Sequence, residues 1–329
     1  MREVALAMLA SLVGGSIAAP FVFKLLVKLK SAQNVSAHLE GHQHKQGTPT
    51  MGGIIVLIGL LCGMACTWRA EYLGVLVLIL GFAAVGFADD YLVPKLKPGS
   101  RGLSWMPKLG LEIGAAVGAA FLTGWTSPWQ MGLFVFLVLF LSNAYNFSDG
   151  LDTLSGGLGV ILCLGLGALA LSINWGISNE GSFIMRDVTF FIPLACVALA
   201  LGCAFLPFLY LNAPPAKVFM GDVGALPIGA SFAWLVSMFL MPVVSGENYG
   251  FSSSYLVPIF IFLIVMFAEI VPVPIQIFWV KVFKKRAFKF KTPIHHAFED
   301  LGWPHTRIAW AFHVVQAALV VLALAWMWL

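Results

Sequence analysis

The chain has 329 residues, of which 60% are hydrophobic and only 10% are charged, with a formal net charge of +4. Soluble domains carry about 25% charged residues, so this composition excludes an ordinary soluble protein and indicates a polytopic protein of the lipid bilayer. We expect no nucleic-acid partner. We expect a single integral membrane domain over residues 1–329.

Ten apolar runs approach or exceed the roughly 20 residues that a helix needs to cross about 30 Å of hydrocarbon. In chain order they cover residues 4–27, 51–68, 71–88, 109–126, 129–146, 154–174, 188–209, 223–242, 255–280 and 308–328. The sequence therefore predicts an all-α fold of about ten transmembrane helices. Pro272 and Pro274 predict a break in the ninth, because proline removes a helical hydrogen bond and kinks the axis.

The basic residues predict how the chain crosses the membrane. Of the 19 Lys and Arg residues, all but Arg2, Arg69 and Arg186 lie at the end of, or after, the first, third, seventh or ninth run. Loops rich in Lys and Arg stay in the cytoplasm, so these loops are expected to be cytoplasmic and both termini periplasmic.

Several acids gather on this same predicted side. Asp89 and Asp90 end the third run, Asp149 and Asp152 follow the fifth, and Asp222 opens the eighth. A charge inside a membrane costs about 2.5–3.5 kcal/mol on insertion scales, so such acids require a reason. Carboxylate oxygens are the ligands that Mg²⁺ prefers, which favours a metal-dependent site at the cytoplasmic face. One alternative to a metal site is that these acids are solvated helix ends or helix caps. The other is a transporter or channel, which would carry its acids at mid-depth along an ion path.

Four polar strings mark the cytoplasmic ends of the runs: residues 45–53, 143–152, 212–222 and 291–299. Their candidate ligands for phosphate, metal, sugar or base are Lys45, Thr48, Asn143, Asn146, Asp149, Asp152, Asn212, Phe219, Asp222, His295 and His296. Simpler interpretations are a membrane-entry turn, helix caps, ordinary packing of the Phe219 ring and solvated histidines.

Together the strings resemble the polyprenyl-phosphate N-acetylhexosamine-1-phosphate transferase superfamily. Gly47-Thr-Pro-Thr-Met-Gly-Gly53 and Pro293-Ile-His-His296 resemble its phospho-N-acetylmuramoyl-pentapeptide transferase branch. The resemblance runs in order from about residue 42 to 303. It implies ten helices with periplasmic termini in the bacterial inner membrane. It also implies Mg²⁺-dependent transfer of phospho-MurNAc-pentapeptide from UDP-MurNAc-pentapeptide to undecaprenyl phosphate, giving lipid I and UMP for peptidoglycan synthesis. A homodimer is a family expectation.

The resemblance also assigns roles to residues. Asp89 and Asp90 match paired acids near the lipid phosphate and metal, Asp222 matches a Mg²⁺ ligand, and His295 matches a catalytic histidine. Asp149 matches the acid of the nucleotide-sugar site, and the positions that line the uridine pocket are matched by Lys45, Gly150, Leu151, Asp152, Asn212 and Phe219. Further candidates for substrate binding are Thr48, Asn143, Asn146, Lys95 and His296.

Two positions depart from the family pattern. Ala297 replaces a third consecutive histidine, and Val93 replaces a lysine for which Lys95 is the nearest substitute. The closest rival is a sister enzyme that uses UDP-GlcNAc; it shares the acids but differs in the 47–53 string and the histidine loop.

Overall fold

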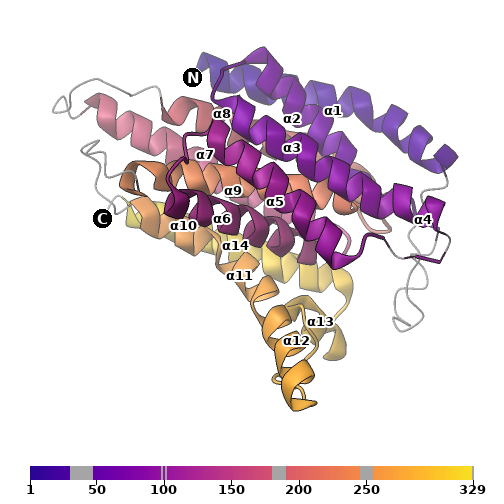
Figure 1. Ribbon diagram of the computed structural model, residues 1–329. Helices are drawn as coiled ribbons and strands as arrows, with labels where there is room; N and C mark the ends of the chain where they lie inside the picture. The colour runs from indigo at the N-terminus through magenta and orange to yellow at the C-terminus, as the bar shows by residue number, and fades with distance from the viewer. Residues whose placement is uncertain (30–46, 98, 101, 180–189, 245–254, 328–329) are drawn as a thin grey trace.

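A computed structural model of the chain describes residues 1–29, 47–97, 99–100, 102–179, 190–244 and 255–327. These residues form helices joined by loops, so the fold is all-α as predicted (Figure 1). In chain order the helices are α1 (Arg2–Leu29), α2 (Gly53–Cys66), α3 (Tyr72–Phe87), the π-helical turn η2 (Ala88–Leu92), α4 (Val93–Leu96), α5 (Trp105–Leu122), α6 (Pro128–Phe147), α7 (Leu154–Asn179), α8 (Phe191–Asn212), α9 (Asp222–Val244), α10 (Leu256–Phe262), α11 (Ile264–Ile270), α12 (Pro272–Phe283), α13 (Ile294–Asp300) and α14 (His305–Trp326).

Eight helical segments within the described residues are long and apolar enough to span a membrane. They are α1, α3 continued through α4, α6, α7, α8, α9, α11 continued through α12, and α14. A polytopic helical protein is therefore confirmed, while the count of ten spans stays a prediction. The other two predicted spans correspond to α2, which has only 14 residues, and to α5, which carries Lys108 and Glu112. Both pack within the bundle, α2 against α1 and α8, and α5 against α3 and α6.

Helix α9 organises the bundle, because it is the most buried of the candidate spans. Its sequence is apolar around most of its circumference, as expected for a helix enclosed by neighbours. It packs against α3, α6 and α2. This packing brings Asp222, the first residue of α9, to the end of α3 that carries Asp89 and Asp90.

The contact between α2 and α9 depends on two glycines. A Cβ added to Gly224 would lie 2.4 Å from Gly53 Cα, so neither position has room for a side chain. We expect Gly224→Val to force the helices apart, at a cost of about 1–3 kcal/mol, and to lower the thermal unfolding temperature of the purified protein. Gly114→Ala is the control, because a Cβ there meets nothing within 4 Å. Equal unfolding temperatures for Gly224→Val and the unsubstituted protein would contradict this close packing.

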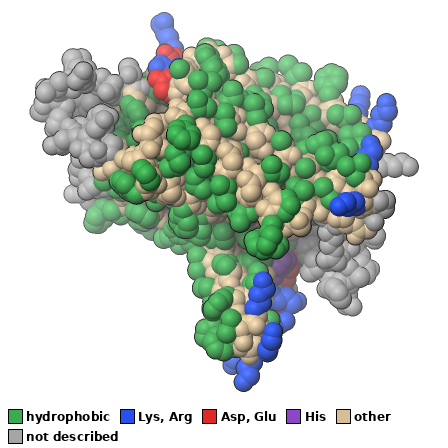
Figure 2. Space-filling view, viewed as in Figure 1, with side chains coloured by type: hydrophobic (Ala, Val, Ile, Leu, Met, Phe, Trp, Pro, Cys, Tyr) green, Lys and Arg blue, Asp and Glu red, His purple; other side chains and the backbone are tan. Residues whose placement is uncertain are grey.

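The ninth predicted span is interrupted, as its prolines indicated. Helix α12 begins at Pro272, where the missing N–H is tolerated because the first helical turn has no partner for it. A second interruption at Leu263, between α10 and α11, was not expected from the sequence. Helices α12 and α13 project from the bundle (Figure 1), and Lys and Arg side chains cover part of this projection (Figure 2).

Both ends of the described chain lie at one end of the bundle, opposite the carboxyl end of α3 (Figure 1). Arg69, in the loop before α3, pairs with Glu3 of α1 at 2.6 Å near that end. Two of the three basic exceptions, Arg2 and Arg69, are therefore gathered there, whereas Arg186 lies outside the described residues. Their periplasmic location stays a prediction.

Candidate functional site

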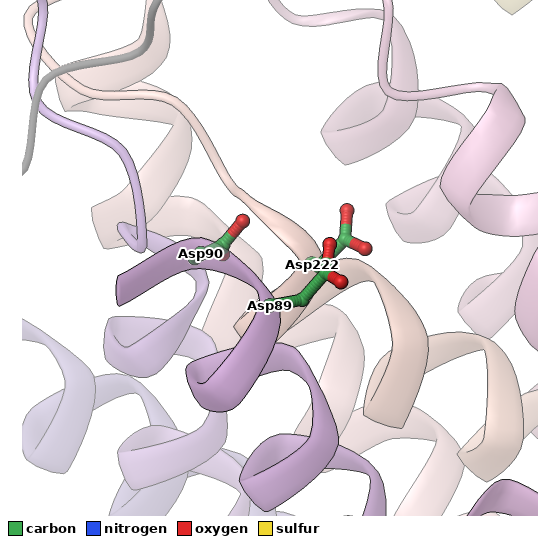
Figure 3. A group of neighbouring side chains, drawn as sticks. All are labelled: Asp89, Asp90 and Asp222. Carbon is green, nitrogen blue, oxygen red and sulfur yellow. The ribbon is translucent and has the colours of Figure 1, made fainter. Parts of the chain in front are cut away.

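Three carboxylates from two distant segments meet at the end of the bundle opposite the termini. Asp89 and Asp90 lie in the π-helical turn that ends α3, and Asp222 is the first residue of α9. Each offers an oxygen, and these oxygens all lie within 4.8 Å of one another (Figure 3). Single π-helical turns are frequent at functional sites, because they shift side chains out of the ordinary helical register.

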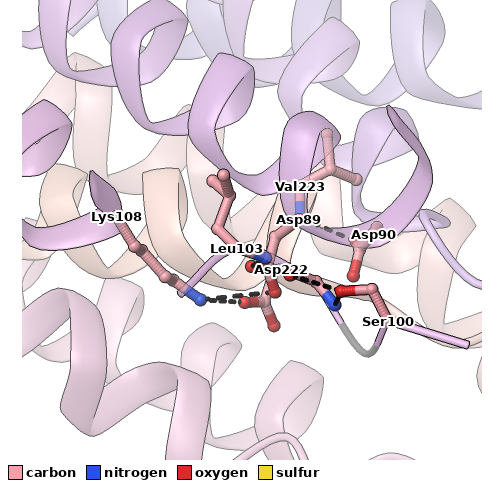
Figure 4. Close-up of polar contacts among 8 residues, drawn as sticks. Asp89, Asp90, Ser100, Leu103, Lys108, Asp222 and Val223 are labelled. Carbon is pink, nitrogen blue, oxygen red and sulfur yellow. Dashed lines mark hydrogen bonds and ion pairs between the residues drawn. The ribbon is translucent and has the colours of Figure 1, made fainter. Parts of the chain in front are cut away.

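Backbone N–H groups hold two of these carboxylates. The Leu103 N–H donates to Asp89 Oδ1 at 2.7 Å, and the Val223 N–H at the start of α9 donates to Asp90 Oδ2 at 3.1 Å (Figure 4). Gly221 has φ +73°, and a Cβ there would lie 2.6 Å from Asp90 Oδ2. Glycine therefore serves both the left-handed backbone and the close approach of the carboxylate.

Among the residues that the structure describes, Lys108 of α5 is the cation that contacts this cluster. Its Nζ lies 2.5 Å from Asp222 Oδ2 and 3.5 Å from Asp89 Oδ2 (Figure 4). The sequence suggested Lys95 for a basic position here, but Lys95 instead donates to the Tyr91 hydroxyl at 2.9 Å on an exposed surface. Lys108 was missed because a lysine near the start of an apolar run is typical of any cytoplasmic loop.

The described part of the first string, residues 47–53, lies beside the 212–222 string. The Phe219 N–H donates to the Pro49 carbonyl at 2.8 Å, and the Gly52 N–H donates to the Phe219 carbonyl at 2.7 Å. Thr48 and the Phe219 side chain are half-buried beside this pairing. Lys45 lies outside the described residues. Two motifs that are far apart in the chain thus form one wall next to Asp222.

The turn after α6 is tied to the segment before α9. Asn212 is buried; its Oδ1 accepts from the Thr153 N–H at 2.7 Å, and its Nδ2 donates to the Val218 carbonyl at 2.9 Å. Asp152 Oδ2 accepts from the Ala216 N–H at 3.2 Å. The amide of Asn212 therefore joins two backbone segments, while its place in the nucleotide-sugar site stays a prediction.

The other predicted residues of this turn differ in how they are placed. Asp149 Oδ1 accepts from the Ser155 hydroxyl at 2.6 Å. Asn143 donates to the Leu139 carbonyl of its own helix at 2.8 Å, and Asn146 is half-buried. The Leu151 side chain is buried in a small core cluster with residues of α7 and α14, so only its backbone is available to a ligand.

The histidine loop contains two contacts that the sequence did not predict. His295 is only 1% exposed, and its Nδ1 lies 2.9 Å from Oε2 of Glu269, which is 0% exposed. His296 Nδ1 lies 2.5 Å from Glu299 Oε2. Burial, together with the neighbouring His295, lowers the pKa of His296 below its usual value. His295 was predicted to be catalytic, but the structure buries it against Glu269 and Gly150 rather than beside the three acids.

The chemistry of the acid cluster suits a hard divalent cation. Three carboxylates converge, each is half-buried rather than solvated, and two are oriented by backbone N–H groups. Oxygen donors of this kind are what Mg²⁺ and similar ions take from proteins. Asp89, Asp90 and Asp222 therefore fit the role of metal ligands, with Lys108 offsetting part of their charge.

Comparison with known proteins identifies the family. The sequence model of Glycosyl transferase family 4 matches residues 72–240, and that of phospho-N-acetylmuramoyl-pentapeptide-transferase signature 1 matches residues 45–57. The phospho-N-acetylmuramoyl-pentapeptide-transferase of Picosynechococcus sp. is 34% identical, over 96% of this chain and 84% of that protein. The chain belongs to the phospho-N-acetylmuramoyl-pentapeptide-transferase family.

Further relatives in this family match along nearly the whole chain. The transferase of Clostridioides difficile is 31% identical, over 91% of this chain and 90% of its own length. That of Heliobacterium modesticaldum is 32% identical, over 98% of both chains. The resemblance found in the sequence is therefore confirmed. The matched 72–240 region contains all three clustered acids and Lys108.

Proposed function

We propose that this protein transfers phospho-MurNAc-pentapeptide from UDP-MurNAc-pentapeptide to undecaprenyl phosphate, forming lipid I and releasing UMP. The observation that carries the proposal is the convergence of Asp89, Asp90 and Asp222 beside Lys108 at one end of an apolar bundle. A site at this end can meet a lipid phosphate in the bilayer and a polar nucleotide in the cytoplasm. The membrane in which this reaction would take place is the bacterial cytoplasmic membrane, with the acid cluster at its inner face.

Asp222 and Asp89 would hold Mg²⁺, with Asp90 completing the set of carboxylates. When bound there, the ion would supply Lewis-acid neutralisation of the donor's pyrophosphate. Asp89 is oriented by the Leu103 N–H and faces Lys108 through its other oxygen, so it can orient the lipid phosphate or take its proton. Lys108 offsets charge that accumulates when two phosphorylated substrates meet.

The reaction we propose is a direct displacement. An oxygen of the lipid phosphate attacks the phosphorus linked to the sugar, and the bond from that phosphorus to UMP breaks. A covalent aspartyl phosphate is the alternative route. The half-buried, backbone-held carboxylate of Asp89 suits an orienting role, because its Oδ1 already accepts the Leu103 N–H.

The nucleotide-sugar would lie along the wall formed by the 47–53 and 212–222 strings and the turn after α6. Asp149, Asp152 and the half-buried ring of Phe219 offer groups for the sugar and base. Asn212 would act indirectly, by fixing the turn to the segment before α9.

The test is a purified-protein assay with two donors. UMP release is expected from UDP-MurNAc-pentapeptide with undecaprenyl phosphate and Mg²⁺, and chelation by EDTA should stop it. UDP-GlcNAc should give none, and release from UDP-GlcNAc alone would establish the sister activity instead. Ion flux in liposomes without UMP release would favour a transporter.

A further inference from the structure

A buried acid–histidine pair packs against the turn that follows α6. Glu269 is on α11, in the interrupted ninth span, and His295 is on α13, in the projection. His295 Nδ1 lies 2.9 Å from Glu269 Oε2, and the two side chains are 1% and 0% exposed. Two polar groups so far from solvent depend on each other, because removal of one leaves the other buried without its partner.

The pair fixes which edge of the imidazole faces the turn. An ionised carboxylate can only accept, so with Glu269 in that form the ring proton lies on Nδ1, and Nε2 is on the opposite edge of the ring. Among the described residues, Nε2 has no hydrogen-bond partner. It lies against Gly150, where an added Cβ would be only 2.4 Å from it.

Gly150 stands between the two acids of the turn, Asp149 and Asp152. The turn is also held by Asn212, which accepts from the Thr153 N–H, and by the bond from the Ala216 N–H to Asp152. The His295 ring packs against the same turn at Gly150. The shape of the turn therefore depends on these two hydrogen bonds and on the orientation of a single ring.

We propose that Glu269 is a positioning residue, which holds the His295 ring against Gly150 and thereby sets the turn of residues 149–152 for the nucleotide-sugar. The inference rests on the proposed function, since it assigns this turn to the donor. It also gives His295 a different role from the one that its sequence suggests. The ring supports the turn that forms part of the donor site, and it does not touch a reacting atom.

The test separates the two substrates kinetically. We expect Glu269→Ala to raise the KM for UDP-MurNAc-pentapeptide by about tenfold or more, because the buried ring loses the partner that orients it, with the KM for undecaprenyl phosphate unchanged. Glu269→Gln keeps an oxygen that accepts from Nδ1–H, so its donor KM should stay within about threefold of the unsubstituted protein. Gly150→Ala should raise the donor KM like Glu269→Ala, because its Cβ displaces the ring.

The control is Gln316→Ala, which removes another buried hydrogen bond, from Gln316 Nε2 to the Phe262 carbonyl at 2.8 Å. It should lower the thermal unfolding temperature without a selective rise in donor KM. An unchanged donor KM in Glu269→Ala, an equal rise for both substrates, or a Gln variant as impaired as the Ala variant would overturn the positioning role. Absence of UMP release by the unsubstituted protein would instead overturn the proposed function, and the donor role of the pair with it.

Discussion

Asp222→Asn should lower kcat by at least about 10²-fold, with little effect on folding. Loss of a group that merely orients a metal ligand typically costs 10–100-fold, so loss of a ligand should cost at least as much. Asn has nearly the same size as Asp and a similar helix propensity, so α9 should form normally with Asn as its first residue. The measurement is UMP release at saturating donor and lipid, over a range of Mg²⁺ concentrations.

Asp300→Asn is the matched control for this substitution. It makes the same chemical change at an exposed acid of α13 that pairs with Lys291 at 2.6 Å, away from the cluster. Its turnover should equal that of the unsubstituted protein. Full activity in Asp222→Asn would remove Asp222 from the proposed scheme, and equal losses in both variants would mean that the loss is not specific to the cluster.

Lys108→Met should have the second largest effect on activity, and it should change both the Mg²⁺ requirement and kcat. Lys108 contacts both Asp222 and Asp89, so its loss leaves three carboxylates with one positive charge fewer among them. Two charges about 4 Å apart near a protein surface interact by about 4 kcal/mol. We expect half-maximal activity at a lower Mg²⁺ concentration, because the cluster attracts cations more strongly, and a fall in kcat of about 10²-fold, because substrate phosphates lose a counter-charge.

Lys97→Met removes the same charge from an exposed residue at the end of α4 and is the control. It should change neither kcat nor the Mg²⁺ requirement. If Lys108→Met shifted the Mg²⁺ requirement upward, or left kcat unchanged, the lysine would not be acting on the acids and phosphates in this way.

The sequence predicted that Asp89, Asp90 and Asp222 lie close together, but it also grouped Asp149 and Asp152 with them and did not predict Lys108 as their cation. Asp89, Asp90 and Asp222 stand where apolar runs meet polar loops, and such positions are conspicuous in a chain with so few charges. Lys108 stands at a similar boundary, but lysines are expected there for orientation alone. Only the packing of α5 against α3 shows that its ammonium reaches the two acids.

Side-chain roles in the turn after α6 were harder to predict. A sequence motif identifies which residues lie near one another, but not which way each side chain points. The Asp149 carboxylate could face a ligand, whereas the Asn212 amide bonds to the backbone and the Leu151 side chain packs in a core cluster. Glu269 does stand out in the sequence. It is an acid within a predicted span, and such residues usually have a buried partner.

The most direct test is magnetic resonance on the purified protein with Mn²⁺ in place of Mg²⁺ and UMP as the product ligand. If Asp89 and Asp222 hold the ion that faces the phosphates, the bound Mn²⁺ will show coupling to the phosphorus of UMP in the unsubstituted protein and lose it in Asp222→Asn. Equally tight Mn²⁺ binding with the same phosphorus coupling in Asp222→Asn would contradict a metal site at these acids.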